Sequence, residues 1–117
     1  MMNRPLDDLT TTEFKTHFSD KHTRTDLADA YAAASNAFWW NADNIDDYEE
    51  DTPEYQAACV LTDEWAALMN TYKCRILKIL TEENITIPQV GQIRVILPFM
   101  ERYGYVCSSG WWLKEND

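Results

Sequence analysis

Side chains that could act in nucleophilic or acid–base catalysis are few in this chain. Cys59, Cys74 and Cys107 are its only thiols, and His17 and His22 are its only imidazoles. A reactive thiolate is favoured at a helix N-terminus or beside a cation, whereas Cys59 and Cys74 are predicted to lie inside a long helix. No Gly-flanked serine or cysteine forms a nucleophile elbow. We therefore expect inert, buried thiols, surface histidines and no enzymatic activity.

Metal and cofactor sites are not indicated either. Six acids in residues 43–51 could supply oxygen ligands, but they lack the alternating order and the central glycine of an EF-hand loop. Zinc sites need closely spaced cysteines or histidines. Phosphate-binding loops need clustered glycines, whereas the three glycines of this chain lie far apart. We expect no resident metal or cofactor.

The strongest chemical signal is a group of carboxylates in the middle of the chain. The net charge is −10, and residues 26–72 contain eleven acids and no lysine or arginine. Seven of these acids fall within twelve residues: Asp43, Asp46, Asp47, Glu49, Glu50, Asp51 and Glu54. If helical, they would span about 18 Å, or one charge per ~2.6 Å against ~1.7 Å in duplex DNA. Such a field repels nucleic acid and membrane surfaces and attracts a basic protein partner, although a merely solubilising acidic loop is the alternative.

Wide aromatic side chains adjoin these acids. Phe38, Trp39 and Trp40 are consecutive, so on a helix they cannot all face one core. The two tryptophans at 111–112 are neighbours on a predicted strand, where one points inwards and the other outwards. Exposed tryptophan and tyrosine are typical interface anchors, which makes Trp39, Trp40 and Tyr48 candidate partner contacts. A homodimer interface or a second packing layer would explain the same rings equally well.

Two helices are predicted to precede the acidic segment. Thr10 and Glu13 form a capping box at the start of a short helix. Thr25 is the predicted N-cap of a second, alanine-rich helix, which should end around residues 41–44. Its apolar side chains repeat at steps of three and four, as in an amphipathic helix. Residues 1–9 are predicted to form a flexible tail.

A long third helix is predicted after an acidic connection over residues 43–51. Thr52-Pro53 is typical of an N-cap followed by proline at the first helical position. Apolar residues then continue at helical spacing to about Glu83.

The C-terminal part has a different pattern, in which a β-prone run at 85–87 precedes a helix over 90–103. Pro98 is predicted to kink that helix or to begin a second one, and Gly104 is predicted to end it. Residues 108–110 then read as the turn of a β-hairpin.

These elements predict a mainly α fold, a helical bundle with one long helix and a small C-terminal β-hairpin. We interpret residues 1–117 as one domain with a helical part over 10–84 and a strand–helix–hairpin part over 85–117. Three cysteines without a short spacing, and the absence of a secretory leader pattern, favour a reducing cytoplasm. No apolar run approaches the length of a membrane span.

The C-terminal part resembles the winged-helix family, in which a recognition helix leads through glycine into a strand and a wing. The matching residues are IRVILPFMERYGYV (93–106) and GWWL (110–113). Only residues 88–92 separate the first predicted strand from the last helix, so the family's middle helix is missing or cut to a turn and the fold would be truncated. The resemblance implies contact with nucleic acid or a partner through Arg94, Arg102, Trp112 and Lys114.

As a whole, the chain resembles small acidic inhibitors from phages and mobile elements, including anti-CRISPR proteins, in its size, acidity and lack of a catalytic motif. This resemblance implies a non-enzymatic protein-binding module. Such a module would bind a basic nucleic-acid-binding protein through the seven central acids with Trp39, Trp40 and Tyr48, and would mimic nucleic acid. The alternative function is a winged-helix-like transcriptional regulator or adaptor acting through residues 88–114.

Overall fold

The fold is mainly helical and ends in a small antiparallel sheet. The computed structural model describes residues 2–3, 9–83, 92–108 and 111–115. Within them lie helices α1 (Thr11–Phe18), α2 (Arg24–Asn44), α3 (Pro53–Glu82) and α4 (Gln92–Arg102), and the 3-10 turn η1 (Ile45–Asp47). The strands are β1 (Met2–Asn3), β2 (Tyr105–Ser108) and β3 (Trp111–Glu115). The predicted bundle with one long helix and a C-terminal hairpin is therefore confirmed.

Threonine side chains begin the first three helices. The predicted caps of α1 and α3 are confirmed, because Thr10 and Thr52 accept hydrogen bonds from the first turn of their helices. The prediction for α2 is wrong by two residues, since Thr23 rather than Thr25 is its N-cap. Asp26 lies three residues after Thr23 and completes a capping box, which no acid could do for Thr25.

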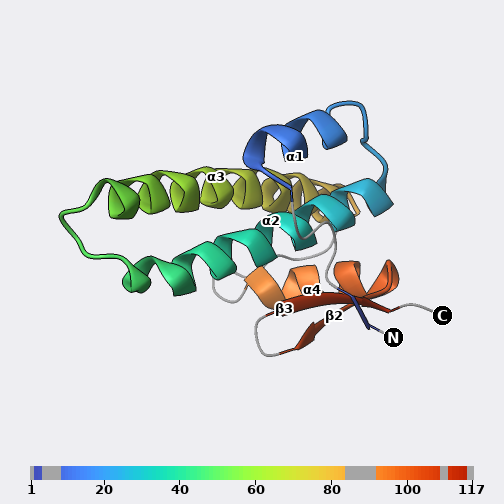
Figure 1. Cartoon of the computed structure of the whole chain (residues 1–117). Helices are drawn as coiled ribbons and strands as arrows, with labels where there is room; N and C mark the ends of the chain where they lie inside the picture. Colours follow the sequence, from blue (N-terminus) through green and yellow to red (C-terminus); the bar gives the residue numbers. More distant parts are fainter. Residues whose placement is uncertain (1, 4–8, 84–91, 109–110, 116–117) are drawn as a thin grey trace.

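Two layers of structure enclose α2 (Figure 1). It runs antiparallel to α3, and the C-terminal sheet lies on its other side together with α4. Five alanines of α2, at positions 28, 30 and 32–34, are buried. Because alanine adds only a methyl group, α3 and the sheet can both approach the α2 backbone closely. The alanine-rich sequence therefore suits a helix that is covered on opposite faces.

An aromatic cluster holds α1 against α3. The Phe14 ring packs edge-on against Trp65, with ring centroids 5.4 Å apart, and against Tyr72 at 5.7 Å. Phe18 lies one turn further along α1 and contacts the same tyrosine. Full burial of a phenylalanine such as Phe14 contributes about 2–3 kcal/mol, so this short helix is anchored by two side chains.

The central strand of the sheet is β3, with β2 on one side and β1 on the other. The hairpin pairs Tyr105 with Lys114 and Ser108 with Trp111. The pairing of β1 with β3 departs from the expected flexible tail, because Met2–Asn3 form antiparallel contacts with residues 114–115. The predicted strand at 85–87 lies outside the described residues.

The helix before the hairpin continues through its proline. α4 is a single helix in which Pro98 is an interior and exposed residue, so no second helix begins there. Among the side chains of α4 whose burial the structure describes, Ile96, Phe99 and Met100 are buried. Gly104 follows with φ at 89°, the left-handed conformation that glycine adopts without a Cβ clash. This residue ends α4 as predicted and turns the chain into β2.

Asn36 joins the sheet to the middle of α2. Its Nδ2 donates to the carbonyl of Trp112 at 2.8 Å, and its Oδ1 accepts from the N–H of Trp112, also at 2.8 Å. Both residues are buried. A side-chain amide therefore replaces a neighbouring strand at this point of β3, and it leaves the Trp112 backbone fully satisfied.

A second polar contact joins the same two elements. The Tyr105 hydroxyl donates to Asp29 Oδ1 at 2.5 Å, and the Lys114 ammonium lies 3.3 Å from the same oxygen. Burial, followed by the hydrogen bond to Asp29, raises the pKa of Tyr105 far above its ordinary value. Burial also raises the pKa of Tyr31, to about 12, with a smaller contribution from Cys107.

The end of the α2–α3 pair that lies furthest from the sheet has no interior of its own. The buried residues of α2 end at Asn36, and those of α3 begin at Trp65. No residue between these limits is buried. We call residues 37–64 the distal hairpin, and Figure 1 shows it extending past α1 and the sheet.

Replacing Asn36 tests the contact between helix and sheet. Asn36→Ala should lower the free energy of unfolding by about 2–5 kcal/mol, because it leaves two buried backbone groups of Trp112 unpaired. Asn41→Ala is the matched control, since Asn41 bonds only to the Ala37 carbonyl of its own helix. Urea unfolding measures both variants, and similar small losses for the two would contradict the assigned role.

The buried phenols predict a loss of stability in alkali. The pKa of both tyrosines is raised above the ordinary 10.0, so their stabilising effect is complete below pH 10. It is then lost as the pH rises, through about 12 for Tyr31. Thermal melting against pH should show this fall, and Tyr105→Phe should melt lower at neutral pH with a shallower alkaline decline. An identical alkaline slope in the variant would contradict the assignment.

Candidate functional site

The seven clustered carboxylates lie at the turn of the distal hairpin. Asp43 is in the last turn of α2, the next two aspartates are in η1, and Glu54 is in the first turn of α3. The remaining three acids lie in the connection between η1 and α3. All seven residues are exposed. We call residues 43–54 the acidic tip, and its chain reverses direction, so the charges form a cluster at one end rather than a straight helical row.

Local structure explains why the acids turn instead of extending the helix. α2 tightens into the 3-10 turn η1, and Tyr48 then adopts an extended conformation with φ −105° and ψ 147°. The Thr52 hydroxyl donates a hydrogen bond to the Glu49 carbonyl at 2.7 Å and accepts one from the N–H of Tyr55. The same threonine therefore closes the connection and starts α3.

Positive charge is absent from the distal hairpin. Residues 37–64 contain nine acids and no lysine, arginine or histidine. The ion pairs found among the described residues involve Asp20, Asp29 and Glu83, all of which lie outside it. The pKa of Tyr55 is raised, first by its hydrogen bond to Cys59 and further by the negative charges of Glu50 and Asp46. The tip is thus a concentrated negative surface, and no ion pair among the described residues neutralises it.

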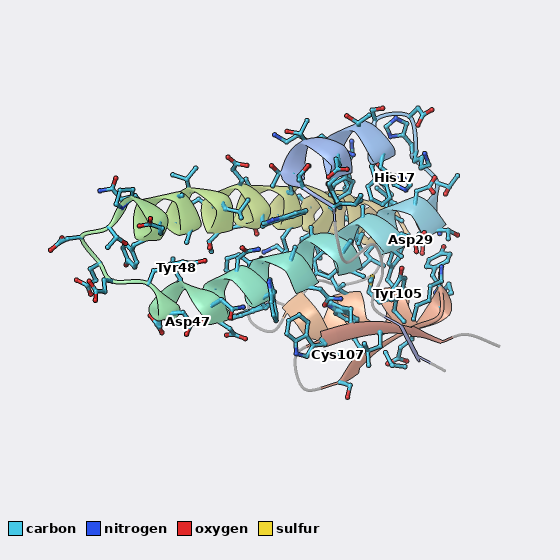
Figure 2. The ribbon with its side chains drawn as sticks, viewed as in Figure 1. His17, Asp29, Asp47, Tyr48, Tyr105 and Cys107 are labelled. Atoms are coloured by element: carbon cyan, nitrogen blue, oxygen red, sulfur yellow. The ribbon has the colours of Figure 1, made fainter. Side chains whose placement is uncertain are left out.

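Three of the predicted aromatic contacts are exposed beside these acids. The exposed fractions are 48% for Trp39, 54% for Trp40 and 45% for Tyr48. Phe38 is half-buried, as expected if three consecutive rings cannot all face one core. Figure 2 shows Tyr48 and Asp47 close together at the turn of the hairpin. The predicted carboxylates and rings are therefore exposed in the same hairpin.

A groove separates the two helices on the distal hairpin. Its volume is about 510 Å³. Trp40 of α2, Asp47 and Tyr48 of the connection, and Glu54, Ala57 and Leu61 of α3 are among the residues that line it. The exposed Leu61 lies one helical turn after Ala57 and gives α3 an apolar stretch in the groove, which Asp47 and Glu54 also line. The sequence does not single out Leu61, because this residue lies outside the regularly spaced apolar positions that predict the buried face of the long helix.

The alternative contact set is not assembled. The prediction that Trp112 contacts a partner is wrong, because its side chain is only 2% exposed and packs against Tyr31. Lys114 is half-buried and paired with Asp29. Arg102 is exposed at the end of α4. The side chain of Arg94 lies outside the described residues.

The residues considered for catalysis are dispersed. His17 is exposed on α1, where its ring contacts Phe18, and His22 is exposed in the following turn. The three cysteines are free, but the expectation that they are buried is wrong, since Cys59 is half-buried and the other two are exposed. No group of three His, Cys, Asp or Glu side chains within the described ranges could hold a metal ion.

The Tyr105–Asp29–Lys114 cluster is the polar group that sequence analysis missed. Figure 2 shows Tyr105 and Asp29 together at the end of the molecule away from the acidic tip. Tyr105 is 1% exposed and its raised pKa keeps it protonated, so it acts as a hydrogen-bond donor rather than a base. Because 76 residues separate it from Asp29, no local sequence pattern could have indicated the pair.

Comparisons with known proteins add no relative. The chain matches no protein-family model, no curated protein and no solved structure. Where the structure describes the chain, no helix combines the length and the apolar character needed to cross a membrane. The surface itself therefore carries the functional argument.

Repulsion within the acidic tip predicts a salt-dependent stability. One variant, called tip-neutral, neutralises four of the seven acids of the tip through Asp43→Asn, Asp46→Asn, Glu49→Gln and Glu50→Gln. It should melt about 4 °C higher at low ionic strength because like charges are removed. The difference should vanish near 1 M salt, where the screening length falls to ~3 Å. Calorimetry at both salt concentrations measures it. A variant that melts no higher than the wild type in dilute buffer would show that the acids do not repel one another measurably.

Proposed function

We propose that this protein is a non-enzymatic binding module whose acidic tip docks on a basic, nucleic-acid-binding protein and occupies the surface that nucleic acid would use. The observation that carries the proposal is the concentration of seven exposed carboxylates in the acidic tip of a hairpin that contains no cation. A nucleic-acid-binding surface is built to neutralise phosphates with lysine and arginine, and the same cations would meet these carboxylates.

Charge alone would give a weak and unspecific contact. The exposed rings of Trp39, Trp40 and Tyr48 add what the carboxylates lack. Tryptophan and tyrosine are frequent interface hot spots because they bury a large area when they dock. The acids would attract a basic partner, and the rings would bury area against it. Together they support a specific complex.

The position of this surface supports inhibition rather than catalysis. The seven carboxylates are all exposed, whereas a catalytic acid or base is usually held in a pocket that excludes water. Small acidic inhibitors of phages and mobile elements, including anti-CRISPR proteins, act through surfaces of this kind, and we assign the protein to that functional class. The winged-helix-like alternative gains no support, because Trp112 and Lys114 are engaged within the fold.

The proposal is tested by capture from nuclease-treated extracts of the cells that make the protein. The immobilised wild type should retain a nucleic-acid-binding protein, and added duplex DNA should release it. The tip-neutral variant should bind that protein at least about tenfold more weakly and with a shallower dependence on salt, because fewer ionic contacts form. Retention is measured across a salt gradient and by titration with the purified partner.

A matched variant separates the tip from net charge. Asp20→Asn, Asp63→Asn, Glu82→Gln and Glu101→Gln remove four exposed acids that lie outside the acidic tip. This control should bind like the wild type. Equal weakening of both variants, or full binding by the tip-neutral variant, would contradict the proposed function.

A further inference from the structure

The groove on the distal hairpin has a composition that selects one kind of side chain. Two half-exposed rings, Trp40 and Tyr48, line it together with the carboxylates Asp47 and Glu54. Ala57 and Leu61 give it an apolar wall. At about 510 Å³ it lies within the ~300–1,000 Å³ range of ligand pockets, so more than one side chain of a partner can enter.

Rings and carboxylates together fit a flat cation. A guanidinium group stacks on an aromatic face, donates two parallel hydrogen bonds to a carboxylate, and is more weakly hydrated than an ammonium group. Removing water from the cation when it pairs with a groove carboxylate therefore costs less free energy for arginine than for lysine. The apolar wall on α3 in turn favours a neutral apolar neighbour.

From these features we infer that the groove receives an arginine side chain together with an adjacent apolar side chain of the partner. The arginine stacks on Trp40 and pairs with Asp47 or Glu54, while the apolar side chain packs against Ala57 and Leu61. This inference rests on the proposed function, and it names the chemistry by which the basic partner is recognised.

A second copy of this chain is a poorer occupant. Two distal hairpins placed against each other would oppose nine acids with nine acids and bring no cation between them. Such an arrangement is opposed by electrostatic repulsion. Charge complementarity therefore favours a cationic segment of a different protein.

Two neighbouring tryptophans make a matched pair of variants for the test. Trp40 is 54% exposed and lines the groove, whereas Trp39 is 48% exposed, contacts Phe38 and does not line it. The probes are a short synthetic peptide in which arginines flank a leucine and the same peptide with lysines. Binding is measured by fluorescence anisotropy, and circular dichroism checks that each variant melts like the wild type.

The expected result is a selective loss. Trp40→Ala should weaken the arginine peptide about tenfold and the lysine peptide about twofold, because stacking on a desolvated ring favours guanidinium. Trp39→Ala should show no such preference and should weaken the two peptides to the same extent, because the Trp39 ring belongs to the proposed interface but does not line the groove. Equal losses for the two peptides in Trp40→Ala, or equal effects of the two variants, would overturn the inference.

The groove carboxylates are tested separately from the other acids. The pair Asp47→Asn and Glu54→Gln should weaken the arginine peptide more than the pair Asp46→Asn and Glu49→Gln, although both change the net charge equally. Indistinguishable pairs would overturn the assignment of Asp47 and Glu54.

The remaining outcomes distinguish this inference from the proposed function. If both peptides bind in a salt-dependent manner without any preference for arginine, the groove assignment fails while a basic partner remains supported. If neither peptide binds at low salt, the proposed function fails and the groove assignment fails with it. A dimer in sedimentation that Trp40→Ala dissociates would assign the groove to a second copy and overturn the inference.

Discussion

Two hydrogen bonds between Asn36 and the backbone of Trp112 set the position of the C-terminal sheet on α2. Without them, the middle strand would bury an N–H and a carbonyl that have no partner, and no apolar contact compensates for that cost. Trp112 can bury its ring against Tyr31 because its backbone is satisfied. The burial of the α2 alanines depends on the same contact, because small side chains are buried only when a second layer lies close to the helix.

The molecule thus divides into a packed half and an exposed half along the same two helices. From Asn36 towards the start of α2, and from Trp65 towards the end of α3, side chains are held by α1, α4 and the sheet. Beyond those residues no side chain is buried, although Glu64 still accepts a hydrogen bond from the Thr11 hydroxyl and Phe38 lies against the core. The acids gather in this second half, where carboxylates remain hydrated and lose none of their solvation to burial. Stability and the proposed recognition therefore use separate parts of the chain.

Local signals in the sequence predict the helices well because their causes are local. Thr52-Pro53 begins α3, and Gly104 ends α4, for steric and hydrogen-bonding reasons that act within a few residues. Thr23 rather than Thr25 begins α2 because Asp26, three residues after Thr23, completes a capping box. The pairing of Met2–Asn3 with β3, and the burial of Trp112, depend on residues more than 70 positions away, and no periodicity records such contacts. The acidic surface was foreseeable because a stretch without a single cation has no means of neutralising itself.

The length of α3 would limit how deeply the proposed docking surface enters a partner. Trp65 lies twelve residues after Pro53, and at 1.5 Å per residue this gives about 18 Å of helix beyond the packed half. Two adjacent helices are roughly 20 Å across. The hairpin is therefore a short projection, about as long as it is wide, and it stops where α1 and the sheet broaden the molecule. A recess of similar depth and width would admit the projection, while a flat surface would meet only its end.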